Sequence, residues 1–213
     1  MDSNIKCVSD LRVKRTMENL EKNNIEAFYV EDETMVVDKV KELITEGDTV
    51  SVGGSTTLFE TGVIDYLRCG KYNFLDRYED GLTPADIKQV FRKSFSADAY
   101  FTSSNALTED GELYNVDGNG NRVAAMIYGP DKVIVIVGLN KIVVDVDAAV
   151  ERNRNFSAPA NAMRLNRDTP CTKVGYCMDC KSKDRICNNY VLIARQGMKG
   201  RIKVIIVGKD LGY

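Results

Sequence analysis

The strongest constraint on the fold of this chain is the stretch of residues 49–60, whose sequence is TVSVGGSTTLFE. Alternating β-branched residues predict a strand, two glycines predict a tight turn, and the apolar spacing from Leu58 onward predicts a helix. Glycine permits a positive φ or a close approach of the backbone that a Cβ would obstruct. The first N–H groups of the helix lack intrahelical acceptors and suit a phosphate or carboxylate, with Ser55, Thr56 and Thr57 as further donors. A plain turn followed by a helix cap explains these residues equally well.

Two common nucleotide-binding motifs are absent from this turn, and histidine is absent from the whole chain. The turn contains neither the G-x-x-x-x-G-K-S/T of a P-loop nor the G-x-G-x-x-G of a dinucleotide fold. Without histidine there is no Ser–His or Cys–His nucleophile pair and no His-containing metal site. Acid–base chemistry therefore falls to Asp, Glu, Lys, Tyr or Cys.

Strands and helices alternate through the first half of the chain, and strands dominate the second half. We expect helices at residues 9–24, 32–46, 58–67, 83–95, 145–154 and 158–165. We expect strands at residues 25–30, 49–52, 73–75, 97–102, 112–116, 122–127, 132–137, 141–144, 190–194 and 201–207, with a hairpin turn at residues 117–121. This order predicts an α/β fold with a mostly parallel sheet, flanking helices and a β-hairpin-rich second half.

Length and charge restrict the class of protein further. The 213 residues suffice for a single α/β domain, residues 1–213, with a sizeable core. A formal charge of −2 with scattered Lys and Arg argues against a nucleic-acid or polybasic membrane surface. No apolar run approaches the length of a transmembrane helix, and the N-terminus lacks the apolar core of a signal peptide. We therefore expect a cytoplasmic protein, and a homodimer on the general frequency of such assemblies.

One polar loop, at about residues 168–190, contains four of the six cysteines in the pattern C-x5-C-x2-C-x6-C. The four are Cys171, Cys177, Cys180 and Cys187. Four thiolates in one loop suit zinc or an iron–sulfur cluster. The alternatives are disulfides, which suit a cytoplasmic chain less well, redox thiols, and free structural thiols. The spacing leaves the metal open, because structural zinc more often uses two C-x2-C pairs and the ferredoxin run is not matched.

Several segments together resemble the lactate-utilisation (LUD) domain family, which includes small cytoplasmic bacterial proteins implicated in L-lactate oxidation. The resemblance is carried by VGGSTTL at residues 52–58 with Glu60 and Gly62, FLDR at 74–77, Ala97-Asp98, NALT at 105–108 with Gly111, GNRV at 120–123, Pro130, VIVIVG at 133–138 and NKIV at 140–143. It covers most of the chain from about residue 10 onward. It implies the fold shared by NagB (glucosamine-6-phosphate deaminase), RpiA (ribose-5-phosphate isomerase) and CoA transferases, whose glycine loops meet ligands at the strand C-termini.

Open α/β sheets bind ligands beyond the carboxyl ends of their strands, which places a candidate site in this chain. We expect the following residues to form it: Gly53, Gly54, Ser55, Thr56, Thr57, Asn105, Thr108, Gly120, Asn121, Arg122 and Lys141. Lys141 would supply a cation for a carboxylate or phosphate, or would simply cover the sheet edge. Arg122 would reach in from the hairpin, or would be a solvated charge. Asp76 and Arg77 are expected to pair at a strand end.

The leading hypothesis is a lactate-utilisation-type protein that binds a small anionic metabolite or phosphorylated cofactor. It would carry the cysteine-ligated metal and support oxidation of L-lactate or a related hydroxy acid. With an iron–sulfur cluster it would transfer electrons to redox partner proteins. One alternative is an isomerase- or CoA-transferase-type enzyme with structural zinc, in which Glu60 or Asp110 acts as base or nucleophile. Another is a non-catalytic binding subunit of a redox complex.

Overall fold

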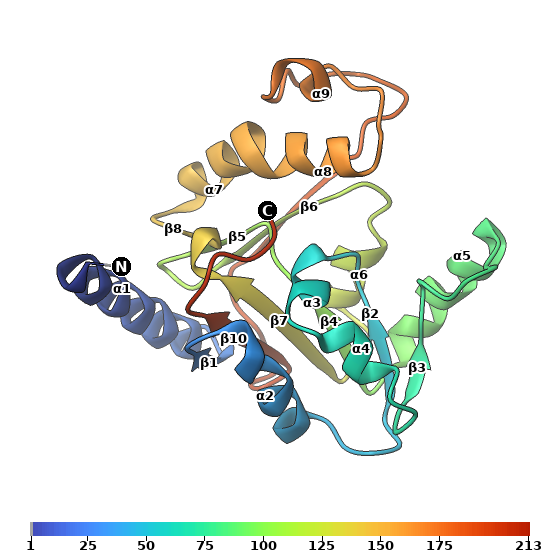
Figure 1. Cartoon of the computed structure of the whole chain (residues 1–213), viewed down its shortest axis with the longest axis horizontal. Coiled ribbons are helices and arrows are strands. Elements are labelled where there is room, and N and C mark those ends of the chain that lie inside the picture. The colour runs from blue at the N-terminus through green and yellow to red at the C-terminus, as the bar shows by residue number, and fades with distance from the viewer. Residues whose placement is uncertain (1) are drawn as a thin grey trace.

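A parallel six-stranded sheet forms the centre of the protein, as a computed structural model describing residues 2–213 shows (Figure 1). The strands are, in spatial order, β1 (Glu26–Val30), β10 (Ile202–Val207), β7 (Lys132–Gly138), β4 (Ala99–Thr102), β2 (Thr49–Val52) and β3 (Asn73–Leu75). Every neighbouring pair in this sheet is parallel. The expected α/β fold with a mostly parallel sheet is therefore confirmed.

A second sheet of four short strands lies beside the first. Its strands are, in order, β8 (Ile142–Val143), β5 (Ala106–Thr108), β6 (Leu113–Asp117) and β9 (Asn189–Ile193). β5 and β6 form an antiparallel pair around residues 109–111, and β9 pairs antiparallel with β6. The hairpin of the second half is thus located at residues 109–111, whose sequence Glu-Asp-Gly is typical of a turn.

Helices cover both faces of the parallel sheet. The α-helices are α1 (Ser3–Lys22), α2 (Val36–Leu43), α3 (Thr56–Glu60), α4 (Val63–Leu67), α5 (Pro84–Lys93), α6 (Asn121–Ile127), α7 (Val146–Arg152), α8 (Ala158–Arg164) and α9 (Cys171–Val174). Short 3-10 turns occupy Glu33–Met35, Ser94–Ser96 and Leu139–Lys141, and a π-helical turn, Asn153–Ser157, joins α7 to α8. Helices α2, α3 and α4 lie in front of the sheet in Figure 1, and α7, α8 and α9 stand above it. Within residues 2–213, no helix is long and apolar enough to cross a membrane.

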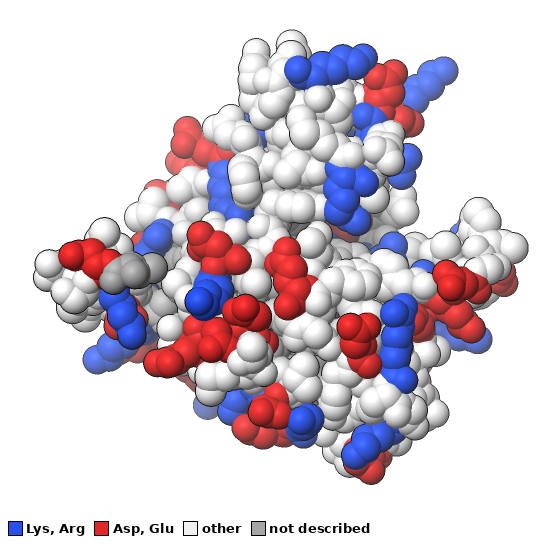
Figure 2. Space-filling model, in the orientation of Figure 1, with Lys and Arg blue, Asp and Glu red and all other residues white. Residues whose placement is uncertain are grey.

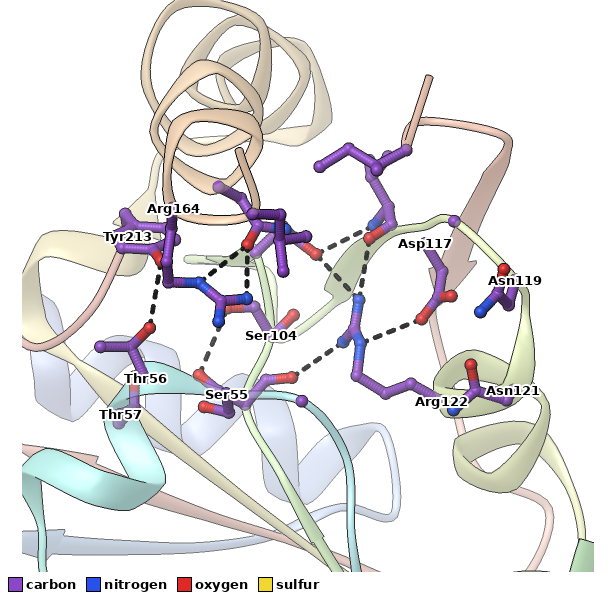
Figure 3. Close-up of a pocket in the computed structure, with 18 of the residues that line it drawn as sticks. Ser55, Thr56, Thr57, Ser104, Asp117, Asn119, Asn121, Arg122, Arg164 and Tyr213 are labelled. Atoms are coloured by element: carbon purple, nitrogen blue, oxygen red, sulfur yellow. Dashed lines mark hydrogen bonds and ion pairs between the residues drawn. The ribbon is translucent and has the colours of Figure 1, made fainter. Parts of the chain in front are cut away.

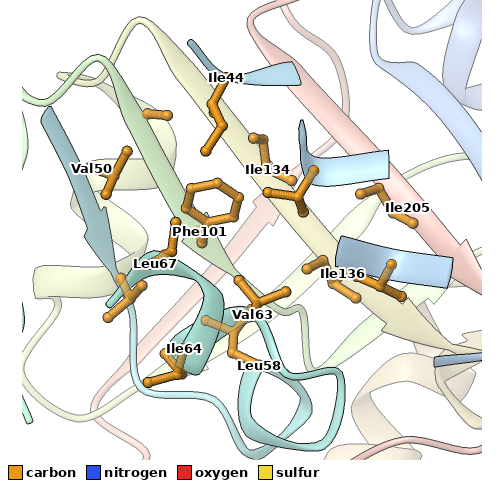
Figure 4. Close-up of a cluster of buried hydrophobic side chains, with 14 of the residues drawn as sticks. Ile44, Val50, Leu58, Val63, Ile64, Leu67, Phe101, Ile134, Ile136 and Ile205 are labelled. Carbon is orange, nitrogen blue, oxygen red and sulfur yellow. The ribbon is translucent and has the colours of Figure 1, made fainter. Parts of the chain in front are cut away.

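The core is divided by the parallel sheet into two apolar layers, and β7 contributes to both. Ile134 and Ile136 pack with Phe101 and the side chains of α2, α3 and α4 (Figure 4). The alternate residues of β7, such as Val135, pack on the opposite face with Tyr100 and side chains of α1 and α6. A strand covered on both faces has no solvent side, so an unbroken Val/Ile run is its natural sequence.

The predictions of a strand at residues 122–127 and of a hairpin turn at residues 117–121 are wrong. β6 runs on to Asp117, and residues 121–127 form helix α6. Gly120, at φ +82°, turns the chain into the helix. Val123 and Met126 are buried three residues apart, whereas Ile127 is 54% exposed, which is a helical and not an alternating pattern. Alanine at two central positions also favours a helix over a strand.

Helix α1 is fastened to the body through the β5–β6 turn. The Asn19 side-chain amide donates to the Glu109 carbonyl at 2.9 Å, and Arg12 Nε donates to the Glu109 carboxylate at 2.6 Å. Gly111 has φ +81°, and a Cβ on it would lie 2.6 Å from the backbone nitrogen of Leu20. Only glycine allows both this φ and this contact with the helix.

Replacing Gly111 with alanine should therefore destabilise the protein more than the same change at Gly70. Gly70 has nearly the same φ, +83°, but a Cβ on it would meet no atom within 4 Å. Backbone strain of about 1–2 kcal/mol is common to both variants, and the clash with α1 should add roughly 1–3 kcal/mol for Gly111→Ala. Urea unfolding of both variants measures the difference. Equal losses would show that α1 does not press on this turn.

Candidate functional site

A polar cavity of about 260 Å³ opens at the carboxyl ends of the parallel strands (Figure 3). Its walls are the turn between β2 and α3, the segment after β4, the β6–α6 connection, and the end of α8. Lys141, after β7, and Tyr213, near the end of the chain, complete the lining. Carboxyl ends of parallel strands meet at one edge of a sheet, so loops distant in sequence converge here.

The glycine turn between β2 and α3 packs tightly and leaves a buried hydroxyl without a partner. A Cβ on Gly53 would lie 2.9 Å from both Arg122 Cγ and Thr102 Oγ1, so glycine is required for the close packing of the turn. Ser55 precedes α3, but its side chain makes no capping hydrogen bond. Its Oγ is buried and has no hydrogen-bond partner within residues 2–213. A buried hydroxyl without a partner is costly unless a ligand or water completes it.

Lys141 is the buried cation of the cavity. It is 2% exposed, and its Nζ donates to Thr57 Oγ1 at 3.1 Å and to Ser103 Oγ at 2.9 Å. No carboxylate of the described residues lies within ion-pair distance of this ammonium. Burial, reinforced by the positive charges of Arg152 and Arg122, lowers the pKa of Lys141 to about 7 against the opposing influence of Glu60. The amine therefore changes charge near neutral pH.

Three further arginines face the same cavity: Arg77, Arg164 and Arg167. The Arg77 guanidinium lies over the Phe91 ring, 4.6 Å from its centroid. Arg164 descends from α8 toward Ser55 in Figure 3, and its Nη2 donates to Asn161 Oδ1 at 2.8 Å. Within residues 2–213, none of the three forms an ion pair. Figure 2 shows Lys and Arg side chains around the hollow beneath α8.

Arg122 lines the cavity too, but its donors are occupied by the protein. Its Nε pairs with the Asp117 carboxylate at 3.2 Å, and its Nη1 donates to Asn115 Oδ1 at 2.6 Å and to the Ser103 carbonyl at 3.0 Å. Its Nη2 donates to Asn105 Oδ1 and to the Val116 carbonyl (Figure 3). A guanidinium has five N–H donors, so this network uses all of them. Arg122 thus fixes the walls of the cavity, and Asp117, the acid in its lining, is already neutralised.

The structure brings together most, but not all, of the residues expected at the site. Those that line the cavity are Gly54, Ser55, Thr56, Thr57, Asn105, Asn121, Arg122 and Lys141. Gly53 and Gly120 lie directly behind it and shape the turns that border it. Thr108, whose hydroxyl accepts the Glu112 N–H at the end of β5, and Asp110, whose carbonyl accepts from Asn23 at the end of α1, do not line it. Glu60 also lies outside the lining, and its carboxylate accepts the Gly212 N–H at 2.7 Å.

Other cavity residues have only weak signals in the sequence, or none. Asp76 pairs with Arg68 at 2.7 Å, so the expected Asp76–Arg77 pair is wrong and Arg77 is left for the cavity. Ser103 follows a strand, which is a usable signal for a site residue. Tyr213 is brought in by a tail fastened to Asn140, whose Oδ1 accepts the Leu211 N–H at 3.1 Å, and its hydroxyl accepts from Thr56 Oγ1 at 3.2 Å. This long-range arrangement has no counterpart in local sequence.

The four clustered cysteines line a second, smaller cavity of about 20 Å³ beside α8. They form no disulfide, and Cys7 and Cys69 are exposed elsewhere. Desolvation raises the pKa of the Cys187 thiol to about 11, and the neighbouring Cys177 contributes in the same direction. Within residues 2–213, no group of three or more His, Cys, Asp or Glu side chains already has metal-binding geometry.

Comparison with known proteins gives one family and several solved structures. The family model described as the LUD domain matches residues 13–207. A DUF162 family protein from Deinococcus radiodurans is 16% identical with a TM-score of 0.54, covering 93% of this chain and 98% of that one. At that identity the likeness shows the fold alone.

More distant likenesses involve subunits of eIF2B. The eIF2B delta protein of Chaetomium thermophilum is 22% identical, with a TM-score of 0.37 over 53% of this chain and 48% of that one. A chain of the tetrameric eIF2B-beta2-delta2 complex from C. thermophilum is 19% identical, with a TM-score of 0.43 over 82% and 55%. These scores are too low to carry an argument. Among curated proteins, no relative matches.

Proposed function

Because the chain belongs to the LUD domain family, we propose that it is a cytoplasmic lactate-utilisation-type protein whose cavity binds a small phosphorylated metabolite or cofactor. Such a protein would serve the oxidation of L-lactate or a related hydroxy acid. Membership of the family supports the role in hydroxy-acid oxidation, and the polar, cation-lined cavity supports a phosphorylated ligand.

The observation that carries the proposal is a buried ammonium with no carboxylate partner among the described residues. Removing a charge from water without pairing it is expensive, and the lowered pKa of Lys141 is the measure of that cost. An anion in the cavity would supply the missing negative charge beside Nζ. Buried ionisable groups with strongly perturbed pKa values gather at functional sites.

The surrounding groups favour a phosphate over a single carboxylate. Within residues 2–213, Arg77 and Arg164 are cations of the lining without an ion-pair partner, and the Ser55 hydroxyl is an unpartnered buried donor. Several cations and hydroxyls converging on one small cavity match an anion with several oxygens and more than one negative charge. A volume of about 260 Å³ is at the small end of ligand sites, so the ligand is a small molecule.

Calorimetric titration with pyrophosphate, inorganic phosphate and L-lactate tests the class of ligand. We expect pyrophosphate to bind most tightly and lactate most weakly, because affinity should increase with the negative charge of the anion. Arg164→Met should weaken pyrophosphate binding about 3- to 10-fold, since an exposed charged hydrogen bond contributes about 1 kcal/mol. Arg92→Met, on the exposed surface of α5, is the matched control and should change nothing. Lactate bound more tightly than both phosphates would contradict a phosphorylated ligand.

Anion affinity should also depend on pH through Lys141. Sulfate is the suitable probe, because it stays doubly charged over the whole range. The amine is protonated below its pKa of about 7, and bound sulfate favours the protonated form. Affinity should therefore fall as pH rises above about 7, by up to about tenfold for each pH unit. Titrations between about pH 6 and pH 9 measure this slope, and a flat profile would remove Lys141 from the anion site.

An isomerase-type enzyme is the second candidate, and the same amine favours it. A general acid or base works best with a pKa near the working pH, and that of Lys141 is about 7. Lys141 suits this role better than Glu60 or Asp110, neither of which lines the cavity. The Glu60 carboxylate accepts the Gly212 N–H, and Asp110 lies toward α1. Interconversion of an aldose and a ketose phosphate by the wild type, lost in Lys141→Met, would support catalysis. Binding of the sugar phosphate without turnover would leave a binding protein.

A further inference from the structure

The segment of residues 168–188 has a defined course but almost no core of its own. Its only regular element is the four-residue helix α9. Val174, Tyr176 and Met178, which could have formed a core, are each about half exposed, at 47%, 52% and 54%. In Figure 1 the segment stands above α8, at the outer edge of the molecule. A segment this small and this polar needs a cross-link to hold one conformation.

All four cysteines of the segment border one small cavity. Cys171, Cys177, Cys180 and Cys187 line the same cavity of about 20 Å³, against the small side chains of Ala158 and Ala162 on α8. The first and last of the four are separated by 15 residues of chain. The volume is close to that of one water-sized sphere, which suits a single ion better than an iron–sulfur cluster. No disulfide competes for the thiols.

The backbone around the C-x2-C pair is already shaped for thiolate ligands. Asp179 adopts φ +47°, which is uncommon for a residue other than glycine. In this conformation its N–H donates to Cys177 Sγ at 3.4 Å. Thr169 Oγ1 lies 3.2 Å from Cys171 Sγ, within reach to donate to it. Hydrogen bonds donated to sulfur favour the charged thiolate.

Arg185 links the backbone at two of the four cysteines. Its Nη1 donates to the Cys180 carbonyl and its Nε donates to the Cys187 carbonyl at 2.8 Å. The same guanidinium pairs with Asp179 at 3.0 Å. Metal ligands are typically held by partners of this kind behind them.

The charge of the segment also complements a thiolate centre. Residues 168–188 contain four Lys or Arg and three Asp, which gives an excess of one positive charge. Four thiolates around one divalent cation carry a net charge of −2. The positive charge of the segment would offset part of it.

From these features we infer that the four cysteines together bind one zinc ion with tetrahedral geometry. On binding, the thiols release their protons and small rotations about Cα–Cβ bring the sulfurs to the ion. The site cross-links residues 171–187 to one another beside α8, which supplies no ligand. Ile186 lines both the cysteine cavity and the anion cavity, and the Asn188 N–H donates to the Asp117 carbonyl at 3.0 Å. The zinc therefore steadies one wall of the anion cavity.

Metal analysis of the full chain, purified with neither added metal nor chelator, tests this inference. We expect one zinc per chain, no sulfide and no visible colour. Cys177→Ser and Cys180→Ser should each lose the zinc, whereas Cys7→Ser and Cys69→Ser, the matched controls at exposed cysteines, should keep it. Brown protein with iron and sulfide would overturn the single-ion site. Metal-free protein, or unchanged zinc in both Cys177→Ser and Cys180→Ser, would overturn it as well.

Should the serine variants not fold, the wild type treated with a chelator keeps the inference testable. Loss of zinc should make residues 168–188 sensitive to protease while the far-ultraviolet circular dichroism of the sheet and helices stays largely unchanged. Full protection of the segment in zinc-free protein would contradict a zinc cross-link. These measurements use no anion, so they stand or fall independently of the phosphate titrations.

Discussion

Replacing Arg122 with methionine is expected to lower the free energy of unfolding by about 3–5 kcal/mol, the range for breaking a buried ion pair by removing one partner. Methionine keeps the unbranched stem beside Gly53 but offers no hydrogen-bond donor. The carboxylate of Asp117 would be left buried without its counter-ion. The oxygens of Asn105 and Asn115 would each lose a charged donor.

The effect is large because Arg122 joins three separate segments. Its guanidinium links the segment after β4, strand β6 and helix α6 through five short contacts. Arg122→Lys should recover only part of the stability, since an ammonium cannot reproduce the planar fork. Urea unfolding measures the change, and Arg92→Met on exposed α5 serves as the control, with an expected change within about 0.5 kcal/mol. A loss below about 1 kcal/mol in Arg122→Met would refute the scaffolding role.

The second large effect is expected on ligand binding, from Lys141→Met. A buried charged hydrogen bond contributes about 1.5–3 kcal/mol, so sulfate or phosphate affinity at pH 6 should fall about 10- to 100-fold. The matched control is Lys88→Met, which removes an exposed lysine from α5 and should leave affinity unchanged. Calorimetric titration of both variants gives the comparison. Unaltered affinity in Lys141→Met would place the anion elsewhere.

Stability should respond to pH in a way that depends on the same lysine. The pKa of Lys141 is about 7 in the folded protein and about 10.4 in an unfolded chain. Between these values the unfolded chain binds one more proton, so this residue's contribution to stability rises with pH across that window and is lost as pH falls toward 7. Lys141→Met should lack this rise. We therefore expect the unfolding free energy of the wild type to rise relative to that of Lys141→Met between about pH 7 and pH 10. Urea unfolding of the two proteins across this range measures the change.

Sequence patterns predicted the strands of the sheet well wherever burial determines which positions are apolar. The Val/Ile run at residues 132–137 is a central strand because both faces of it are covered. They failed at residues 122–127, where the apolar run of residues 123–127 fits a short helix as well as a strand and Gly120 sets the helix start. β5, three residues long, is too short to show a period, and only its partners β6 and β8 define it.

The candidate site was partly visible in the sequence for a related reason. Gly54, Ser55 and Lys141 follow strands, so the rule for open α/β sheets finds them. Arg164 and Tyr213 reach the cavity through packing of distant elements, which no local pattern encodes. Sequence also could not show that the donors of Arg122 are used up while Arg77 is left facing the cavity. That difference arises from which acceptors the fold brings within reach.

The most direct test of anion binding at Lys141 is an NMR titration of its side chain, with lysine labelled at Cε and the signal assigned by its loss in Lys141→Met. Without ligand, the signal should titrate with a pKa of about 7. Saturating sulfate should move that midpoint to higher pH, because the bound anion favours the ammonium. A midpoint near the ordinary lysine value of about 10.4, or one that sulfate leaves in place, would contradict anion binding at Lys141.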